Sequence, residues 1–214
     1  MAQNNAINNK TTQLTIDPGA YGDSFVQFAI NTTDEFRMGV DDDASDAFVI
    51  SQGGALGSSN TYVITADGEV TQPLNPAFFG YLATDELNVT GNSTFHTVGT
   101  TTAFTEVFDQ GSDFNTNGTF TAPITGRYYL SAVLSLLTPS GGGKQVLLRI
   151  STSNRTYNLC AWPMLDRVTT FYGNNQALGI TIDCVADMDA ADTATIVVLA
   201  DGGAKTCDVD GSGS

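Results

Sequence analysis

The stretch FTAPITGRYYLSAVLSLL, from Phe120 to Leu137, decides the fold. It opens with a Pro-x-x-Gly turn, Pro123 to Gly126, and from Tyr128 onward its side chains alternate in character. Because successive residues of a β-strand point to opposite faces, this segment would present two different faces. One face would carry Tyr128, Leu130, Ala132, Leu134 and Leu136, and the other Tyr129, Ser131, Val133, Ser135 and Leu137. The pattern predicts a half-buried strand that is entered through a rigid corner.

The rest of the chain follows the same period of two, and no long window shows helical spacing of apolar residues. We therefore expect an all-β protein. The expected strands are 24–30, 35–40, 46–51, 60–66, 68–73, 77–83, 94–101, 105–111, 118–123, 127–137, 144–152, 155–163, 176–188 and 193–201. Turns rich in Gly, Asn and Asp separate them, as tight β-turns require.

Three regions differ in composition. Residues 1–13 are Asn-rich with little to bury, and they predict an extended N-terminal arm. Residues 14–76 predict a short-stranded β-meander whose apolar content is thin for an independent core. Two prolines and an aromatic run follow, so we expect a domain boundary near residue 77. Residues 77–214 predict a sandwich or jelly roll.

The charge balance excludes some partners. The chain has 23 acidic and 8 basic residues and a net charge of -15, so phosphate backbones and anionic membrane surfaces would repel it. We expect no nucleic-acid binding. The N-terminus lacks the basic and apolar regions of a signal peptide, and no segment has the length of a membrane span. We therefore expect a soluble chain without membrane insertion.

The block around Phe120 resembles the signature of the complement C1q globular head, a jelly roll related to tumour necrosis factor. The matching residues are Val107, Phe108, Asp109, Phe114, Phe120, Pro123, Gly126, Tyr128 and Tyr129. The segments FGYLATDELNVTG and ALGITIDCVADMDAADTATIVVL resemble the opening strand and the penultimate hairpin of that family. The resemblance implies a homotrimeric binding or structural module. Its usual closing strand, Phe-x-Gly-x-Leu, is missing before DVDGSGS, so we expect the last strand to be absent, by truncation.

The first region resembles the short β-repeats of phage and viral fibre proteins, on the segment from Phe36 to Val70. Such fibres are commonly trimeric as well. Together the two resemblances imply a virion structural protein, of phage fibre or capsid-decoration type. Its arm would bind other virion proteins, and its knob would attach to a host surface glycan or protein. Its location would be the virion. The alternative is a soluble C1q-like recognition module that binds glycans or proteins without a virion role.

One aromatic and basic stretch is a candidate binding surface. Its residues are Arg155, Tyr157, Trp162, Arg167 and Tyr172, next to Asn-rich segments. Such side chains can stack on sugars or anchor a protein contact. The other interpretation is that the larger rings pack in the core or between subunits.

Two acidic turns raise the question of calcium, which some C1q-like trimers bind. Asp41 to Asp46 gather oxygen ligands but do not match an EF-hand loop, and Asp187, Asp189 and Asp192 form a second acidic turn. Both are typical of solvated turns. We expect no cofactor, with calcium as the one option kept open.

Nothing in the sequence indicates catalysis. His96 is the single histidine, and no GxSxG or HExxH motif accompanies it. A lone strand histidine is usually structural. Cys160, Cys184 and Cys207 are odd in number and widely spaced, which indicates reduced structural residues and not a disulfide framework or a metal site. We expect a protein that is not an enzyme. The alternative is a polysaccharide-cleaving spike, because the paired carboxylates of a glycosidase need not be near each other in the chain.

Overall fold

The structure is a computed structural model, and it describes residues 15–17, 22–31, 33–137, 145–161, 177–201 and 203–211. The predicted arm, residues 1–13, lies outside the described residues. The chain divides into two compact units, Met1–Asn75 and Pro76–Ser214. No helix in the described part of the chain is long and apolar enough to cross a membrane.

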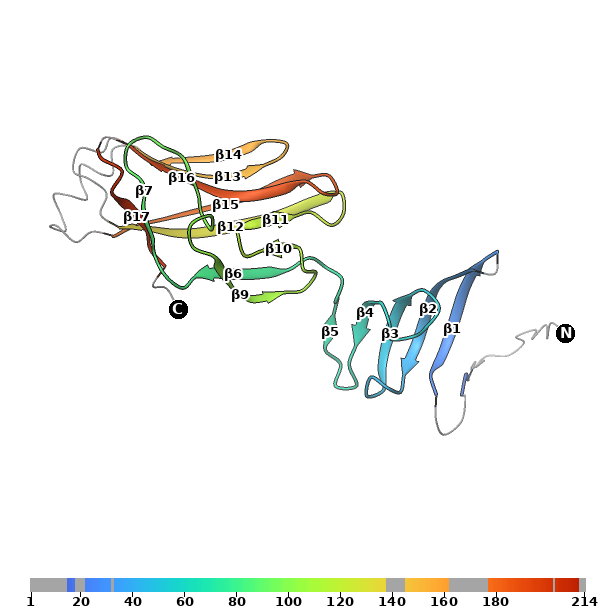
Figure 1. The fold of residues 1–214 in the computed structure, drawn as a ribbon. Coiled ribbons are helices and arrows are strands. Elements are labelled where there is room, and N and C mark those ends of the chain that lie inside the picture. The colour runs from blue at the N-terminus through green and yellow to red at the C-terminus, as the bar shows by residue number, and fades with distance from the viewer. Residues whose placement is uncertain are drawn as a thin grey trace. The chain divides into compact units, whose positions relative to one another are not determined.

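The first unit is an antiparallel meander in which each strand pairs with the next, in the order β1-β2-β3-β4-β5 (Figure 1). Its strands are β1 (Ser24–Ile30), β2 (Thr33–Asp41), β3 (Ala47–Gln52), β4 (Asn60–Ile64) and β5 (Val70–Thr71). Asn31, Ser45 and Asp46 take φ angles of 52°, 57° and 60° in the first two turns. Asn and Asp tolerate this left-handed conformation, which is why such residues occupy these turns.

The second unit is a sandwich of two antiparallel sheets. One sheet has the order β15-β12-β17-β7, and the other has the order β10-β11-β16-β13-β14 with β8 paired to β16. The remaining two strands, β6 and β9, pair with each other. Several neighbours are distant in sequence, such as β7 beside β17 and β11 beside β16, as in a jelly roll. The predicted all-β fold, a meander followed by a jelly roll, is confirmed.

The strands of this unit are β6 (Phe78–Leu82), β7 (Glu86–Thr90), β8 (His96–Thr97), β9 (Phe104–Asp109), β10 (Phe114–Asn115), β11 (Thr119–Thr121), β12 (Gly126–Leu137), β13 (Val146–Thr152), β14 (Thr156–Ala161), β15 (Ala177–Met188), β16 (Thr193–Ala200) and β17 (Cys207–Val209). The sequence predicts most of them within a few residues at each end. It misses β7, β10 and β17 as separate strands. It also extends β8 to 94–101, although the strand covers two residues.

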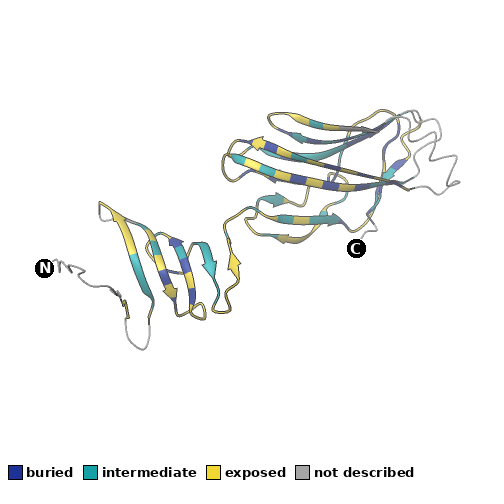
Figure 2. Cartoon of the chain, turned by 180° about the vertical axis from the view of Figure 1, so that it is seen from behind, coloured by how far each residue is buried: buried dark blue, intermediate teal, exposed yellow. Residues whose placement is uncertain are grey.

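Strand β12 has the alternation that its sequence predicts. It pairs with β15 along its whole length, from Gly126 opposite Met188 to Leu137 opposite Ala177. Its even-numbered residues from Leu130 to Leu136 are buried, and the odd-numbered residues beside them are exposed or half-buried. Figure 2 shows this alternation of buried and exposed residues along the strand. The strand therefore forms one wall of the core, as predicted.

The core lies between the two sheets. Leu136 of one sheet and Leu148 and Val198 of the other are each at most 1% exposed and belong to the same hydrophobic cluster. An aromatic group adjoins this cluster, with Phe78 stacked on both Phe114 and Phe120 at centroid separations of 4.6 and 5.1 Å. Stacked and edge-to-face rings at such separations add to the energy of apolar burial. The core is thus aliphatic at its centre and aromatic beside β6.

The corner before β12 is fixed by Tyr128. Its hydroxyl donates a hydrogen bond to the carbonyl oxygen of Ile124 at 2.5 Å, and its ring meets Phe120 edge-on at 5.3 Å. Phe120 is buried, whereas Pro123 is exposed. Gly126 does not have a positive φ, and a Cβ there would meet a ring carbon of Tyr128 at an ordinary 3.8 Å. Of these signature residues, Phe120 and Tyr128 stabilise the corner. A side chain with a Cβ would also fit at position 126.

Candidate functional site

The first candidate surface is one face of the meander sheet. Residues directly opposite each other on paired strands point to the same side. The register places Phe28 opposite Phe36, Val40 opposite Phe48, and Ile64 opposite Val70. The full set, called the meander face, comprises Val26, Phe28, Phe36, Met38, Val40, Phe48, Ile50, Tyr62, Ile64 and Val70. All are exposed or half-buried in the single chain.

The opposite face of the meander has its own small core. Val49 is fully buried and clusters with Ala47 and with Leu56, which lies in the loop after β3. Phe25 packs against this cluster, and the Arg37 guanidinium lies 4.5 Å from the centre of its ring. The chain covers this face with its own loop, so the meander face is the side that a partner would have to cover.

The second candidate surface is the outer face of β12 and β15. Tyr129 stands opposite Val185, and the two side chains are 70% and 61% exposed. Val133 lies four residues further along β12 and is 80% exposed. An ion pair between Arg127 and Asp187, 4.0 Å apart and open to solvent, borders this strip. These residues make a narrow apolar strip with a charged end, called the knob strip below.

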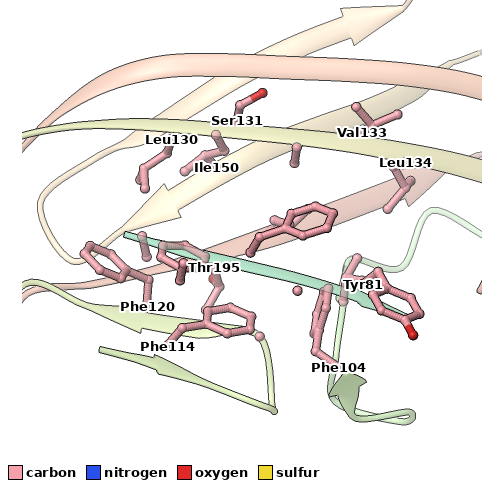
Figure 3. Close-up of a pocket in the computed structure, with 18 of the residues that line it drawn as sticks. Tyr81, Phe104, Phe114, Phe120, Leu130, Ser131, Val133, Leu134, Ile150 and Thr195 are labelled. Atoms are coloured by element: carbon pink, nitrogen blue, oxygen red, sulfur yellow. The ribbon is translucent and has the colours of Figure 1, made fainter. Parts of the chain in front are cut away.

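The third candidate is an apolar groove of about 810 Å³ between β6 and β12. Leu130 and Leu134 of β12 line one side, and the rings of Phe104, Phe114 and Phe120 line the other. Figure 3 shows Leu130 and Leu134 on the side of β12 that faces these rings, and Ser131 and Val133 on the other side. The groove has the size of a ligand site and a mainly apolar lining. It lies within the second unit.

A buried carboxylate fixes the loop beside the groove. Glu86 is fully buried, and its Oε1 accepts hydrogen bonds from the backbone N–H groups of Gly99, Thr101 and Thr102 at 2.9 to 3.2 Å. The Thr101 hydroxyl donates to the same oxygen at 2.7 Å, and Oε2 lies 2.8 Å from Nε2 of His96. Burial alone raises the pKa of Glu86, but the hydrogen bonds from His96 and Thr101 outweigh it and lower the pKa to about 2.

This arrangement gives His96 a structural role, as predicted for a lone strand histidine. The role of Glu86 is not predictable from the sequence, because its donors lie 10 to 16 residues further along the chain. Apart from the Thr101 hydroxyl, the contacts of the described residues bring no nucleophile and no second carboxylate to this pair. The pair holds the loop after β8, and we assign it no chemistry.

The predicted aromatic and basic surface is placed in part. Arg155 is exposed just before β14, and Tyr157 is half-buried and packs against the hydrophobic core. Trp162, Arg167 and Tyr172 lie outside the described residues. The proposed surface of five residues stays a prediction.

The two acidic turns differ in how their carboxylates are arranged. Asp41 and Asp42 each place an oxygen within 4.8 Å of an oxygen of Asp23, which the sequence analysis did not single out. Two of the three carboxylates accept backbone N–H bonds, Asp42 from Gly22 at 3.0 Å and Asp23 from Asp42 at 3.2 Å. Burial first, and then the neighbouring carboxylates, raise the pKa of Asp23. Calcium at this turn stays a prediction.

In the second acidic turn, the carboxylates of Asp187 and Asp192 have partners within the protein. Asp192 accepts hydrogen bonds from the side chain of Asn154 at 2.6 Å and from the N–H of Asp189 at 2.7 Å. The Asp187 carboxylate faces Arg127. These contacts describe a structural hairpin turn.

Comparison with known proteins shows a similarity of structure. No family model matches the sequence, and none of the curated proteins matches it. Among solved structures the chain is similar to the globular domain of zebrafish complement 1qA protein, with 18% sequence identity and a TM-score of 0.39. The match covers 63% of this chain and 92% of that chain.

Proposed function

We propose that this protein is a homotrimeric structural protein of a virion, of phage fibre or capsid-decoration type, and that its second unit is an attachment knob. The observation that carries the proposal is the meander face. A five-stranded sheet that presents ten apolar side chains on its uncovered side needs a partner in water.

The exposed fractions of these side chains show how much apolar surface a partner would cover. Phe28 and Val70 are 50% and 53% exposed, although both are large apolar side chains in paired strands. Burial of apolar surface contributes about 25 cal/mol per Å², so covering several such side chains would contribute several kcal/mol per chain. Association of three copies of the meander face around one axis would supply that burial. The resemblances to fibre repeats and to C1q heads, both trimeric, favour three copies over two.

The knob strip supports association of the second units. Tyr129, Val133 and Val185 are apolar and exposed, and the Arg127–Asp187 pair at the end of the strip could set orientation at a subunit boundary. Three knobs on one axis would bind a host glycan or protein with avidity, so that each knob needs modest affinity. The N-terminal arm would bind other virion proteins. Such a protein acts by geometry and needs no catalytic residue.

The first test measures the oligomeric state of the whole chain. Light scattering should give three times the chain mass of 22.5 kDa. Met38→Glu places a charge in the centre of the meander face and should yield a smaller species, whereas Ser59→Glu, in an exposed loop, should leave the trimer intact. A parent protein of 22.5 kDa, or a Met38→Glu protein that remains trimeric, would contradict the proposal.

The second test addresses the virion. Mass spectrometry of purified particles encoded by the same genome should find peptides of this chain in a fixed ratio to the major capsid protein. Labelled trimer should bind the host cells of that virus and compete with the particle. A chain that is found in culture fluid and is absent from particles would favour a soluble recognition module instead.

A further inference from the structure

We propose that Asp23, Asp41 and Asp42 form a calcium site beside the small core of the meander, and that the ion fastens the start of β1 to the turn after β2. The site lies within the first unit, and the inference depends neither on the trimer nor on the virion role. A cluster of acidic residues alone does not define a site. The observation that points to a ligand is the state of Asp41, a buried carboxylate that receives no hydrogen bond.

Strand pairing brings the carboxylates together. β1 and β2 lie side by side and antiparallel, with Ser24 opposite Val40, so Asp23 comes next to Asp41 at the same end of the sheet (Figure 1). Asp41 also stands opposite Ala47, which belongs to the small core, so the two side chains point to the same face. The carboxylate oxygens of the three aspartates lie within 4.8 Å of one another.

Two backbone hydrogen bonds position the outer two carboxylates. Asp42 accepts a bond from the N–H of Gly22 at 3.0 Å, and Oδ1 of Asp23 accepts a bond from the N–H of Asp42 at 3.2 Å. An ionised carboxylate has about four acceptor positions, so each can bind an ion as well. These bonds fix where the oxygens lie without using up their capacity.

Asp41 has no such partner. It is 4% exposed, and within the described part of the chain no N–H or O–H group donates to its carboxylate and no Lys or Arg pairs with it. The loop after β3 packs directly against it, since a Cβ on Gly57 would lie 2.2 Å from Oδ2 of Asp41. The N–H of Gly57 donates to the buried Ser51 hydroxyl at 3.1 Å, which holds the loop in this place.

A cation would supply the missing partner. Burial of an ionised carboxylate without a hydrogen bond or an opposite charge is costly, and three carboxylates at this separation repel one another. A bound cation removes both penalties at once. The arrangement also differs from an EF-hand loop, because its ligands come from two segments that the pairing of β1 with β2 brings together.

The ligand type and spacing favour calcium. Carboxylate oxygens are ligands for hard cations, and the group contains no thiol or imidazole. Calcium binds oxygen at about 2.3 to 2.6 Å, so two oxygens on one ion lie at most about 5 Å apart, which agrees with the observed spread. Magnesium binds at about 2.0 to 2.1 Å and demands a near-ideal octahedron, which suits an irregular turn less well.

The experiment measures hydrogen exchange of the β2 and β3 amides in the whole chain, first freed of metal by a chelator and then with calcium chloride at constant ionic strength. An ion that binds only the folded form slows exchange through unfolding by a factor of 1 + [Ca²⁺]/Kd. With a Kd on the order of 10⁻⁴ M, about 5 mM calcium should slow these amides about fiftyfold. The β12 amides should change by less than about twofold, and magnesium should slow β2 and β3 by less than about fivefold.

Two substitutions in the same turn form a matched pair. Asp41→Asn keeps the shape and removes the buried charge, so without calcium its β2 and β3 amides should exchange no faster than those of the parent. Calcium should then slow them by less than about threefold. Asp43→Asn removes an exposed charge outside the group and should respond to calcium as the parent does. Asp23→Asn, at a half-buried position, should lose the response as Asp41→Asn does.

Three results would overturn the proposal. One is a parent chain that calcium protects no more than sodium chloride of equal ionic strength, which would mean that Asp41 is uncharged in the folded chain. Another is an Asp43→Asn protein that loses the response as fully as Asp41→Asn, which would indicate attraction to the acidic turn in general. The last is equal protection by magnesium and calcium, which would contradict a site fitted to calcium.

Discussion

Substitution of Glu86 by Gln tests the account of the buried carboxylate most directly. The change keeps the shape and one acceptor oxygen, but it removes the charge that receives five hydrogen bonds. Charge-assisted hydrogen bonds are about twice as strong as neutral ones. The variant therefore isolates the contribution of ionisation.

The size of the effect follows from the pKa. Glu86 has a pKa of about 2 in the folded chain, against an ordinary value of 4.5. One pKa unit corresponds to about 1.4 kcal/mol, so ionised Glu86 stabilises the second unit by about 3 kcal/mol. Because the folded pKa is the lower one, this stabilisation is complete above pH 4.5 and is lost as the pH falls toward 2. We expect Glu86→Gln to cost about 2 to 3 kcal/mol at pH 7 and less than about 1 kcal/mol near pH 2.

The assay is urea-dependent hydrogen exchange of the β12 and β15 amides, because the two units need not unfold together. Glu106→Gln is the matched control. It makes the same chemical change as Glu86→Gln, but at an exposed position on β9. It should stay within about 0.5 kcal/mol of the parent at every pH. A cost for Glu86→Gln that is the same at pH 7 and pH 2.5 would refute the reasoning, because the loss would then be one of packing and not of charge.

Three further predictions concern the corner and the thiols. Tyr128→Phe keeps the ring but loses the hydrogen bond to Ile124, so it should lower the free energy of unfolding by about 1 kcal/mol, measured by the same exchange assay. Gly126→Ala should change stability by less than about 1 kcal/mol, because the site has room for a Cβ; a larger loss in the same assay would show that the glycine is needed after all. Burial first, and the charge of Asp208, raise the pKa of Cys207 to about 12, so at pH 8 it should resist iodoacetamide until urea unfolds the chain. The half-buried Cys184 should be alkylated sooner, as peptide mapping would show.

The sequence predicts strands well where apolar residues alternate over a long run. β12 and β15 each have twelve residues, and their burial follows the predicted period along most of their length. The meander is predictable for the same reason, since Phe36, Met38 and Val40 alternate with polar or small residues. Burial of one face of a strand produces an alternating pattern in the sequence. This pattern can be recognised without knowing which strand is the partner.

The short strands show no such alternating pattern. β17 has three residues, with Asp208 between Cys207 and Val209, and such a short segment reads as a loop. Its strand character depends on β7 and β12, which are distant in the sequence. The loop after β8 differs from the predicted strand because its N–H groups bind Glu86. Contacts of this kind form only in the folded chain.

The candidate surfaces were predictable to different degrees. Trimers are expected from the two resemblances and not from the residue pattern itself. The aromatic lining of the groove depends on how the strands pair, which the sequence does not show. The acidic turn at Asp41 and Asp42 could be read from the sequence, whereas the approach of Asp23 could not, because β1 and β2 bring it there.

A meander with apolar residues on both faces has to protect itself against misalignment. Shifting a strand by one residue exchanges its two faces. Burial penalises this error weakly on β1 and β3, where both faces carry apolar residues, and more strongly on β2, where polar or small residues alternate with the apolar ones. Gly39 supplies another safeguard, because a Cβ at that position would lie 2.0 Å from the carbonyl oxygen of Ser24 and 2.6 Å from Cα of Phe25. A slip would bring Met38 or Val40 to this close crossing, where neither fits. One glycine thus favours one alignment of β1 and β2, so the two strands keep a unique pairing although one face of the sheet is exposed and apolar.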